Sequence, residues 1–270
     1  LDIYGNAEDV KSSFKAFAAG IKPGGTLLVR HELAAHFSPL PDRNILTYAL
    51  EGDAGFATRE LTLDPVSRCY SFRLHTPAGN TPRMTMAYPG LHNVENGVAA
   101  AAAAFLAGAS HEEICRGLET YTGVSRRFDI RFNNNRQIYI DDYAHHPEEL
   151  KAFISSVRKM WPAKKITGIF QPHLYSRTRD FAPEFAHSLD LLDTALILPI
   201  YPARELPIPG VDPQLILRGM TLTDKHQAEK EEILPFLHAH QPEILLTMGA
   251  GDIELMADDL TAFLINEENH

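Results

Sequence analysis

The sequence predicts an α/β protein of two domains, with a doubly wound parallel sheet in its second half. A chain of 270 residues is long enough for about two ordinary domains. Its 44% hydrophobic and 22% charged residues are typical of a soluble globular protein. From about residue 123, short apolar stretches alternate with helical segments, as strands and covering helices do in a parallel sheet. The expected domain boundary lies at residues 121–126.

The first half combines helices with strands of two kinds. A helix capped at Asn6 should place Val10, Phe14 and Phe17 on one face. Further on, apolar and polar residues alternate between proline and glycine breaks, which predicts antiparallel strands. The elements expected here are a helix at 6–19, a buried strand at 26–29, a strand at 45–50, antiparallel strands within 56–88, and helices at 92–106 and 110–121. The last helix opens with the Ser-x-x-Glu pattern of a capping box.

The second half carries the regular alternation. Strands are expected around residue 130 and at 138–140, 166–170, 195–198 and 244–247, and helices at 147–160, 180–191, 226–239 and 252–265. Three asparagines at 133–135 supply the turn of a hairpin. Pro147 fits the first helical position, where its missing N–H costs nothing. The pattern indicates a doubly wound sheet with one hairpin.

Charge and composition narrow the functional classes. The formal net charge of −10 argues against a nucleic-acid-binding surface. Cys69 and Cys115 have no metal-binding spacing and suggest no disulfide framework, so a reducing cytoplasm is the expected location. No apolar run approaches the length of a membrane span, so no membrane partner is expected. Because the chain begins with Leu1 rather than methionine, we expect it to be part of a longer protein.

The stretch Asp-Asp-Tyr-Ala-His-His-Pro at residues 141–147 is the most informative one. It joins a strand to a helix, and ligands bind at such positions in open α/β sheets. Each residue alone has an ordinary explanation, with a histidine capping the helix and the aspartates accepting loop N–H groups. Because the five polar residues Asp141, Asp142, Tyr143, His145 and His146 occur together, we interpret the loop as a functional site.

Three further loops follow expected strands, at residues 171–180, 199–205 and 249–252. Arg177 and Arg179 in the first of them offer guanidinium groups that bind carboxylates or phosphates in a bidentate manner. The glycines of the last loop permit close backbone approach. Each loop also has a structural alternative. The arginines of the 171–180 loop can form surface ion pairs, an Arg–Glu pair can form within the 199–205 loop, and the 249–252 loop can be a plain glycine turn. Since parallel strands end at one edge of a sheet, all four loops should lie along that edge.

Two other motifs have the chemistry to contact a nucleotide. Asn93 and Asn96 are spaced to share one helix face, and their side-chain amides can read a base edge such as that of adenine. Asn93 alternatively caps the helix. Arg127, between Arg126 and Phe128, either reaches a bound nucleotide or helps to tie the two domains together. The sequence contains neither a G-x-x-x-x-G-K-[ST] phosphate loop nor G-x-G-x-x-G.

Together these motifs resemble the Mur ligase family. The matching stretches are residues 1–5, 92–96, 126–128, 141–147, 170–180 and 249–253, in family order over the whole chain. Family members have a UDP-sugar domain, a central P-loop-type ATPase domain and a C-terminal doubly wound, Rossmann-like domain. The resemblance implies that residues 1–122 are the later part of the central domain and 123–270 the C-terminal domain. The phosphate loop, catalytic glutamate and metal-binding histidine then belong to an N-terminal portion missing from this sequence.

The resemblance implies an ATP-dependent amide-bond ligase of cytoplasmic peptidoglycan synthesis. In the family, ATP phosphorylates the carboxylate of UDP-N-acetylmuramate, L-alanine attacks the acyl phosphate, and Mg²⁺ offsets the charge of the transferred group. Tyr143 resembles the alanine-adding members, whereas members that recycle murein tripeptide more often have phenylalanine there. Without the missing portion, with its principal metal ligands, the chain alone should be inactive.

The same resemblance gives the site residues their expected roles. Asn93 and Asn96 contact adenine, Arg127 and Asp142 contact the ribose or phosphates, Tyr143 flanks the nucleotide, and His145 and Arg177 orient the amino acid as the catalytic pair. Many relatives have arginine where this chain has Leu174. The alanine carboxylate is therefore left to Arg177, with help from Arg179 or His173.

Two readings from other functional classes remain open on the residues alone. The first is a metal-dependent hydrolase, with ligands drawn from Asp141, Asp142, His145, His146 and His173. This reading requires His173 to approach the 141–147 loop. The second is a non-catalytic nucleotide-binding module, which the absent phosphate loop favours.

Overall fold

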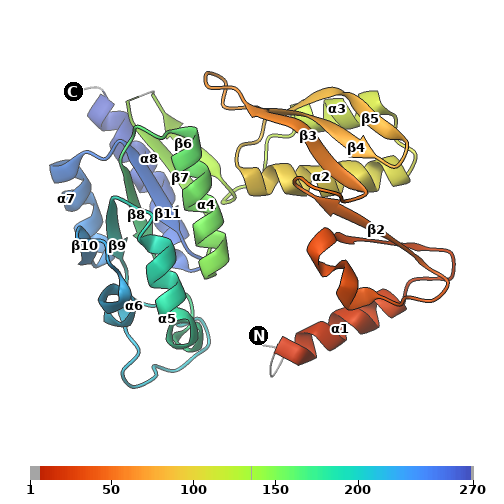
Figure 1. The fold of residues 1–270 in the computed structure, drawn as a ribbon. Helices are drawn as coiled ribbons and strands as arrows, with labels where there is room; N and C mark the ends of the chain where they lie inside the picture. The colour runs from red at the N-terminus through yellow and green to blue at the C-terminus, as the bar shows by residue number, and fades with distance from the viewer. Residues whose placement is uncertain (1–6, 135, 269–270) are drawn as a thin grey trace. The chain divides into compact units, whose positions relative to one another are not determined.

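The chain folds into two compact units. The computed structural model describes residues 7–134 and 136–268, and its units are Leu1–Thr122 and Gly123–His270. Each unit has its own sheet, with five strands in the first and six in the second. Figure 1 shows helices and strands mixed in both units, which confirms the predicted α/β class.

The first unit is built on a mixed sheet with the strand order β1-β2-β3-β4-β5. β1, β2 and β3 are parallel, whereas β3, β4 and β5 are antiparallel, as predicted for residues 56–88. The elements are α1 (Ala7–Ala19), β1 (Thr26–Arg30), η1 (His31–Phe37), β2 (Asn44–Ala49), β3 (Phe56–Leu63), β4 (Tyr70–Thr76), β5 (Gly79–Met86), α2 (Leu91–Leu106) and α3 (His111–Thr120).

The core of this unit lies between the antiparallel strands and α2 with α3. Apolar residues alternate along β4, so Phe72 and Leu74 are buried in one cluster with Val98 of α2. The predicted capping box of α3 is present. The Ser110 hydroxyl accepts the Glu113 N–H at 3.3 Å, and the Glu113 carboxylate accepts the Ser110 N–H at 2.8 Å.

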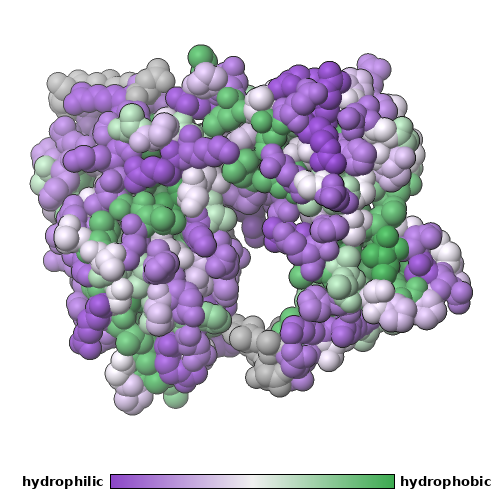
Figure 2. Space-filling view, viewed as in Figure 1, coloured by the Kyte–Doolittle hydropathy of each residue, from purple (hydrophilic) through white to green (hydrophobic). Residues whose placement is uncertain are grey.

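The early part of the first unit is less covered than the sequence predicts. The strand expected to be buried at 26–29 is an edge strand in which only Val29 is buried. Phe14 and Phe17 on α1 are 56% and 77% exposed. Apolar residues also reach the surface around β2 (Figure 2). The prediction of a buried strand was wrong because it assumed a covering layer that the described residues of this unit do not provide.

The second unit is a sheet with the strand order β10-β9-β8-β11-β7-β6. The strands from β10 to β7 are parallel, and β6 forms the predicted hairpin with β7. The Asn134 N–H donates to Gln137 O in the hairpin turn, and Asn135 lies outside the described residues. The elements are β6 (Asp129–Asn133), β7 (Ile138–Asp142), α4 (Pro147–Met160), β8 (Ile166–Phe170), α5 (Tyr175–Leu189), β9 (Thr194–Ile197), α6 (Pro213–Gly219), β10 (Lys225–Gln227), α7 (Lys230–His240), β11 (Ile244–Met248), η2 (Asp252–Met256) and α8 (Ala257–Glu268).

Helices cover both faces of this second sheet. α4, α5 and α6 lie side by side on one face, and α7 and α8 lie on the other (Figure 1). Tyr139, Ile169 and Leu245 point to the second of these faces and belong to one buried cluster with apolar residues of α7 and α8. β7, β8 and β11 are buried along their whole length. The unit is therefore doubly wound, as predicted.

The predicted elements of the second unit need three corrections. The short elements α6 and β10 were not predicted, and α7 begins at Lys230 instead of residue 226. α5 begins at Tyr175, not at residue 180. Phe181 has a non-helical backbone conformation, and Pro183 follows it inside the helix, so α5 is divided into two parts. The sequence gives a clear helical signal only for the later part. Arg177 and Arg179 therefore lie on a helix rather than in a loop.

Candidate active site at the carboxyl edge of the second sheet

The carboxyl ends of four parallel strands meet at one edge of the second sheet. Met248 of β11 is in register with Asp142 of β7 and with Phe170 of β8, and Phe170 is in register with Ile197 of β9. The four loops predicted to share an edge therefore do so. Ligands bind at this edge in open α/β sheets.

Asp141 is a buried structural group at this edge. Its Oδ2 accepts a hydrogen bond from Arg126 Nε at 3.1 Å, and its Oδ1 accepts one from the Thr247 hydroxyl at 2.6 Å. The hydroxyl of Tyr139 lies 3.0 Å from Thr247 Oγ1 and donates to it, because the Thr247 hydrogen is already directed to Asp141. Burial raises the pKa of Tyr139, so its phenol stays a neutral donor. Both oxygens of Asp141 thus serve the fold.

Asp142 holds two backbone segments of the candidate site, the turn at Phe128 and the start of the loop at Ala144. Its Oδ2 accepts the Phe128 N–H at 2.7 Å and its Oδ1 accepts the Ala144 N–H at 2.8 Å. Burial raises the pKa of Asp142 to about 6, although these two hydrogen bonds act to lower it. The carboxyl group is therefore ionised at neutral pH and takes up a proton in mildly acidic solution.

Arg126 and Arg127 have different environments. Arg126 is 13% exposed and binds Asp141, Glu254 and the Gly249 carbonyl, with its guanidinium 5.2 Å from the Tyr143 ring centre. Sequence reasoning missed this organising role. Arg127 is exposed, and its side chain has no hydrogen-bond partner among the described residues. Positive φ angles at Arg126 and Phe128 turn the chain here, so only Arg127 keeps a guanidinium group available for a ligand.

Tyr143 is the exposed residue of the 141–147 loop, and His145 beside it is half-buried. The Tyr143 ring is 38% exposed and meets the His145 ring edge-on at 5.2 Å. His145 Nδ1 donates to Tyr143 O at 3.0 Å, so in the neutral ring Nε2 remains as the acceptor. Glu149 accepts the backbone N–H groups of His145 and His146, which caps α4. Burial lowers the pKa of His146.

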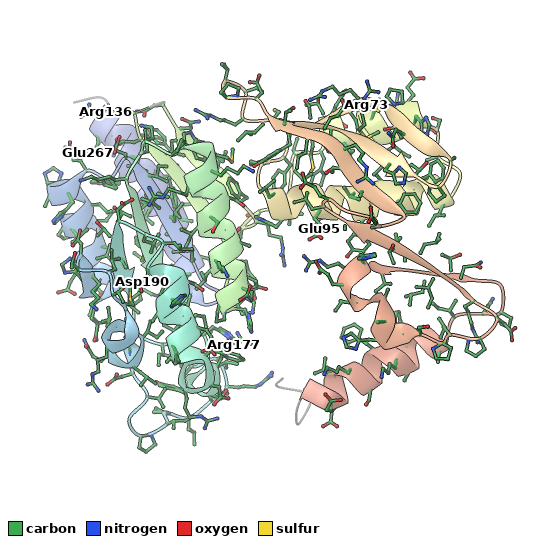
Figure 3. The ribbon with its side chains drawn as sticks, in the orientation of Figure 1. Arg73, Glu95, Arg136, Arg177, Asp190 and Glu267 are labelled. Atoms are coloured by element: carbon green, nitrogen blue, oxygen red, sulfur yellow. The ribbon has the colours of Figure 1, made fainter. Side chains whose placement is uncertain are left out.

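His173 and Arg177 lie at the start of α5, next along the edge. The His145 and His173 rings are 6.0 Å apart, so the structure brings the first and second loops together. Arg177 is half-buried near the N-terminal end of α5, labelled in Figure 3, and its Nη1 is 3.4 Å from His173 Nδ1. No carboxylate in the described part of the chain pairs with Arg177. Arg179, in contrast, is exposed and pairs with Asp180 at 2.7 Å.

The glycine turn after β11 packs closely against the second loop. A Cβ atom on Gly249 would lie 2.7 Å from Gln171 O, and one on Gly251 would lie 2.5 Å from Gln171 Oε1. The Gln171 amide is held by Asp252 Oδ1 at 2.7 Å and by the Ile253 N–H at 2.9 Å. Glycine is therefore required at both positions for the fourth loop to pack against the second.

Asn93 and Asn96 lie on the first unit, near the start of α2. Asn93 is not the N-cap, since Gly90 occupies that position, so the capping alternative was wrong. Asn93 is buried and its amide donates to Pro89 O at 2.7 Å, whereas Asn96 is exposed. Asn93 is thus held in place by one hydrogen bond, and Asn96 is accessible.

The metal-dependent hydrolase interpretation requires His173 to approach the 141–147 loop, and it does, but no set of metal ligands accompanies it in the described residues. Nowhere in residues 7–134 or 136–268 do three or more His, Cys, Asp or Glu side chains gather so that they could hold a metal ion. Asp141 and Asp142 use their oxygens for Arg126, Thr247 and backbone N–H groups. In the same residues, no helix has the length and apolar character needed to cross a membrane.

The fold and the site define a class: α/β proteins that carry imidazole, guanidinium and phenol groups at the carboxyl edge of a doubly wound sheet. Comparison with known proteins gives the family. Residues 1–104 match the Mur ligase middle domain, and residues 126–251 match the family described as Mur ligase, glutamate ligase domain. The chain belongs to the Mur ligase family and carries its middle and C-terminal domains.

Individual relatives agree with this assignment. The chain is 42% identical over 255 residues to the UDP-N-acetylmuramate–L-alanine ligase of Phocaeicola vulgatus, covering 94% of this chain and 55% of the relative. It is 39% identical to the same ligase of Parabacteroides distasonis, covering 99% and 57%. The solved UDP-N-acetylmuramate-alanine ligase of Thermotoga maritima shares its fold, with a TM-score of 0.73, 21% identity, and coverage of 98% and 56%. The chain thus spans about half the length of the curated relatives it matches.

Proposed function

We propose that this chain is part of a cytoplasmic ligase of peptidoglycan synthesis that joins L-alanine to the carboxylate of UDP-N-acetylmuramate at the expense of ATP. The observation that carries the proposal is the half-buried Arg177, which lies 3.4 Å from His173 and has no acidic partner among the described residues. A guanidinium group in such a place is suited to the carboxylate of an amino acid. The choice of L-alanine and UDP-N-acetylmuramate as substrates is supported by relatives that are 36–42% identical and carry the name UDP-N-acetylmuramate–L-alanine ligase.

The site residues have separable roles in this proposal. His145 and Arg177 orient L-alanine, with His173 beside Arg177 as the helper. The ion pair of Arg179 with Asp180 makes Arg179 the weaker candidate for a second helper. Leu174 is buried and takes no part in binding. With Nδ1 of His145 donating to Tyr143 O, Nε2 is the ring nitrogen left to accept a hydrogen bond from the ammonium group of the amino acid.

ATP and Mg²⁺ are the cofactors of the proposal. The free guanidinium of Arg127 is suited to phosphate, and the exposed Tyr143 ring is suited to stacking. Asn93 and Asn96 are assigned to adenine, and Asp142 positions the Arg127 turn through the Phe128 N–H. The described residues contain no cluster able to hold Mg²⁺, so its main ligands are assigned to the remaining portion of the protein. When bound, Mg²⁺ offsets negative charge on the transferred phosphoryl group.

The proposal is tested by ATP hydrolysis in the complete protein. Phosphate release should require both UDP-N-acetylmuramate and L-alanine, and the 270-residue chain alone should release none because it lacks a phosphate loop. Substituting murein tripeptide for L-alanine distinguishes the recycling ligase. Release that depends on the tripeptide, or ATP binding without any release, would replace the proposed function with the recycling ligase or the nucleotide-binding module.

A further inference from the structure

The first turn of α5, which carries Arg177, has no local cap. Leu174 occupies the N-cap position with φ 71° and ψ 135°, a conformation that leucine rarely adopts. Its side chain is 2% exposed and cannot accept a hydrogen bond, unlike the serine or aspartate that usually caps a helix. The strained turn must therefore be held by groups from elsewhere in the unit.

Glu205, in the loop after β9, supplies the missing cap. Its Oε2 accepts the Ser176 N–H at 2.9 Å and its Oε1 accepts the Ser176 hydroxyl at 2.5 Å. Ser176 is the second residue of the helix, where N–H groups lack an acceptor within the helix and where negative charge is stabilised by the helix dipole. A distant carboxylate thus does what an N-cap side chain does in other helices.

Tyr201, in the same loop, fixes the residues just before the helix. Its carbonyl accepts the Leu174 N–H at 2.9 Å, and its N–H donates to Pro172 O at 2.8 Å. The Tyr201 ring stacks on His173 with 5.7 Å between ring centres and 23° between planes. The pairing of β8 with β9 therefore extends past the end of both strands as far as the His173–Tyr201 bridge.

We propose that Glu205 is a positioning residue of the amino-acid site, acting through the first turn of α5. Arg177 follows Ser176 directly, so release of Ser176 would let the turn fray and would remove the fixed direction of the guanidinium group. The inference rests on the proposed function, in which Arg177 binds the carboxylate of L-alanine. None of the residues proposed to contact ATP lies on α5, so the effect is specific to the amino acid.

Steady-state kinetics of the complete enzyme test this role with Glu205→Gln and Ser176→Ala. Glutamine keeps the size of the side chain but replaces one accepting oxygen with an amide group that cannot accept. Each variant should raise KM for L-alanine roughly three- to tenfold, the effect typical of losing a helix cap, and leave KM for ATP unchanged. Ser176→Ala removes only the hydroxyl contact and keeps the backbone N–H bond to Glu205, so it should be the milder of the two variants. The double variant should fall short of the sum of the two single effects, because both substitutions act on the same pair of residues. Glu184→Gln, exposed on the same helix, is the matched control.

A second measurement needs no turnover. In the ligand-free chain, the ¹⁵N resonance of His173 Nδ1 should move in Glu205→Gln and Ser176→Ala in the same direction as in Arg177→Ala, and should stay in place in Glu184→Gln. An unmoved His173 resonance, or an equal rise in KM for ATP, would overturn the inference. If the unmodified enzyme does not use L-alanine, the proposed function fails, and the His173 resonance then decides the positioning role by itself.

Discussion

The two units of this chain differ in how completely each buries its own parallel strands. In the second unit, β7, β8 and β11 are buried at every residue beneath helices on both faces. In the first unit, β1 has one buried residue and β2 has none, while Phe14 and Phe17 of α1 are largely exposed. The second unit thus encloses its central strands, whereas the described residues of the first unit leave its parallel strands partly uncovered.

The largest expected effect is on independent folding. Residues 123–270 expressed alone should unfold in one cooperative thermal transition, because their core is closed. Residues 1–122 alone should bind a dye for apolar surfaces and melt without a sharp transition. Circular dichroism with dye fluorescence measures both. A cooperative, dye-free first unit would remove the basis of the comparison.

The stability contributed by ion pairs should also differ between the two units. Arg126→Ala leaves the buried Asp141 without its cation and should lower the free energy of unfolding of the second unit by about 3–5 kcal/mol. Arg30→Ala in the first unit breaks the more exposed pair with Glu95 and should cost about 0–1 kcal/mol. Urea unfolding of the 123–270 chain measures the first cost, and urea unfolding of the complete protein measures the second. Equal losses from both substitutions would contradict the difference in burial.

Arg177 sharpens the comparison on the functional side, since the amino-acid site is assigned to the second unit alone. In the complete enzyme, Arg177→Ala should raise KM for L-alanine roughly ten- to hundredfold, because a charge-assisted hydrogen bond contributes about 1.5–3 kcal/mol. KM for ATP should hardly change. Arg177→Lys keeps the charge but loses the planar fork, so it should also be impaired. Unchanged alanine kinetics in both variants would return Arg177 to a structural role.

The smallest expected effect is a pH dependence of opposite sign in the two units. The raised pKa of Asp142 means that its contribution to stability is present in full below its ordinary value of 3.8 and is lost as the pH rises through about 6. Hydrogen bonds from Ser110 lower the pKa of Glu113, so its contribution is present above the ordinary value of 4.5 and is lost as the pH falls. Carboxyl-carbon NMR titration measures both midpoints. A titration midpoint of Asp142 below 4.5 would contradict the prediction that burial raises its pKa.

The regular elements of the second unit were predictable because their signals are local. The predicted bounds of β8 and α4 coincide with those of the structure, since a strand with apolar residues at both ends and a proline-started amphipathic helix carry their own patterns. The start of α5 was not predictable, because its cap comes from Glu205 and its N-cap is a leucine. No window of sequence around Leu174 contains that information.

The sequence predicted which loops form the candidate site. It did not predict which of their residues are structural and which remain available to a ligand. The alternation of strands and helices places the four loops at one edge, which the register of β7, β8, β9 and β11 confirms. Which arginine is internal and which is available depends on the positive φ angles of Arg126 and Phe128 and on the position of Asp141. Two adjacent arginines look equivalent in sequence, and only the turn separates them.

The position of β11 in the sheet has a consequence for how the polypeptide is made. β11 comes last of the strands in the chain but lies between β7 and β8, which do not pair with each other. At the usual translation rate of about 5–20 residues per second, β11 is synthesised on the order of ten seconds after β7 and β8. During that interval two apolar strand edges stand open to neighbouring nascent chains. A stop codon before Ile244 would release a product in which this central gap never closes.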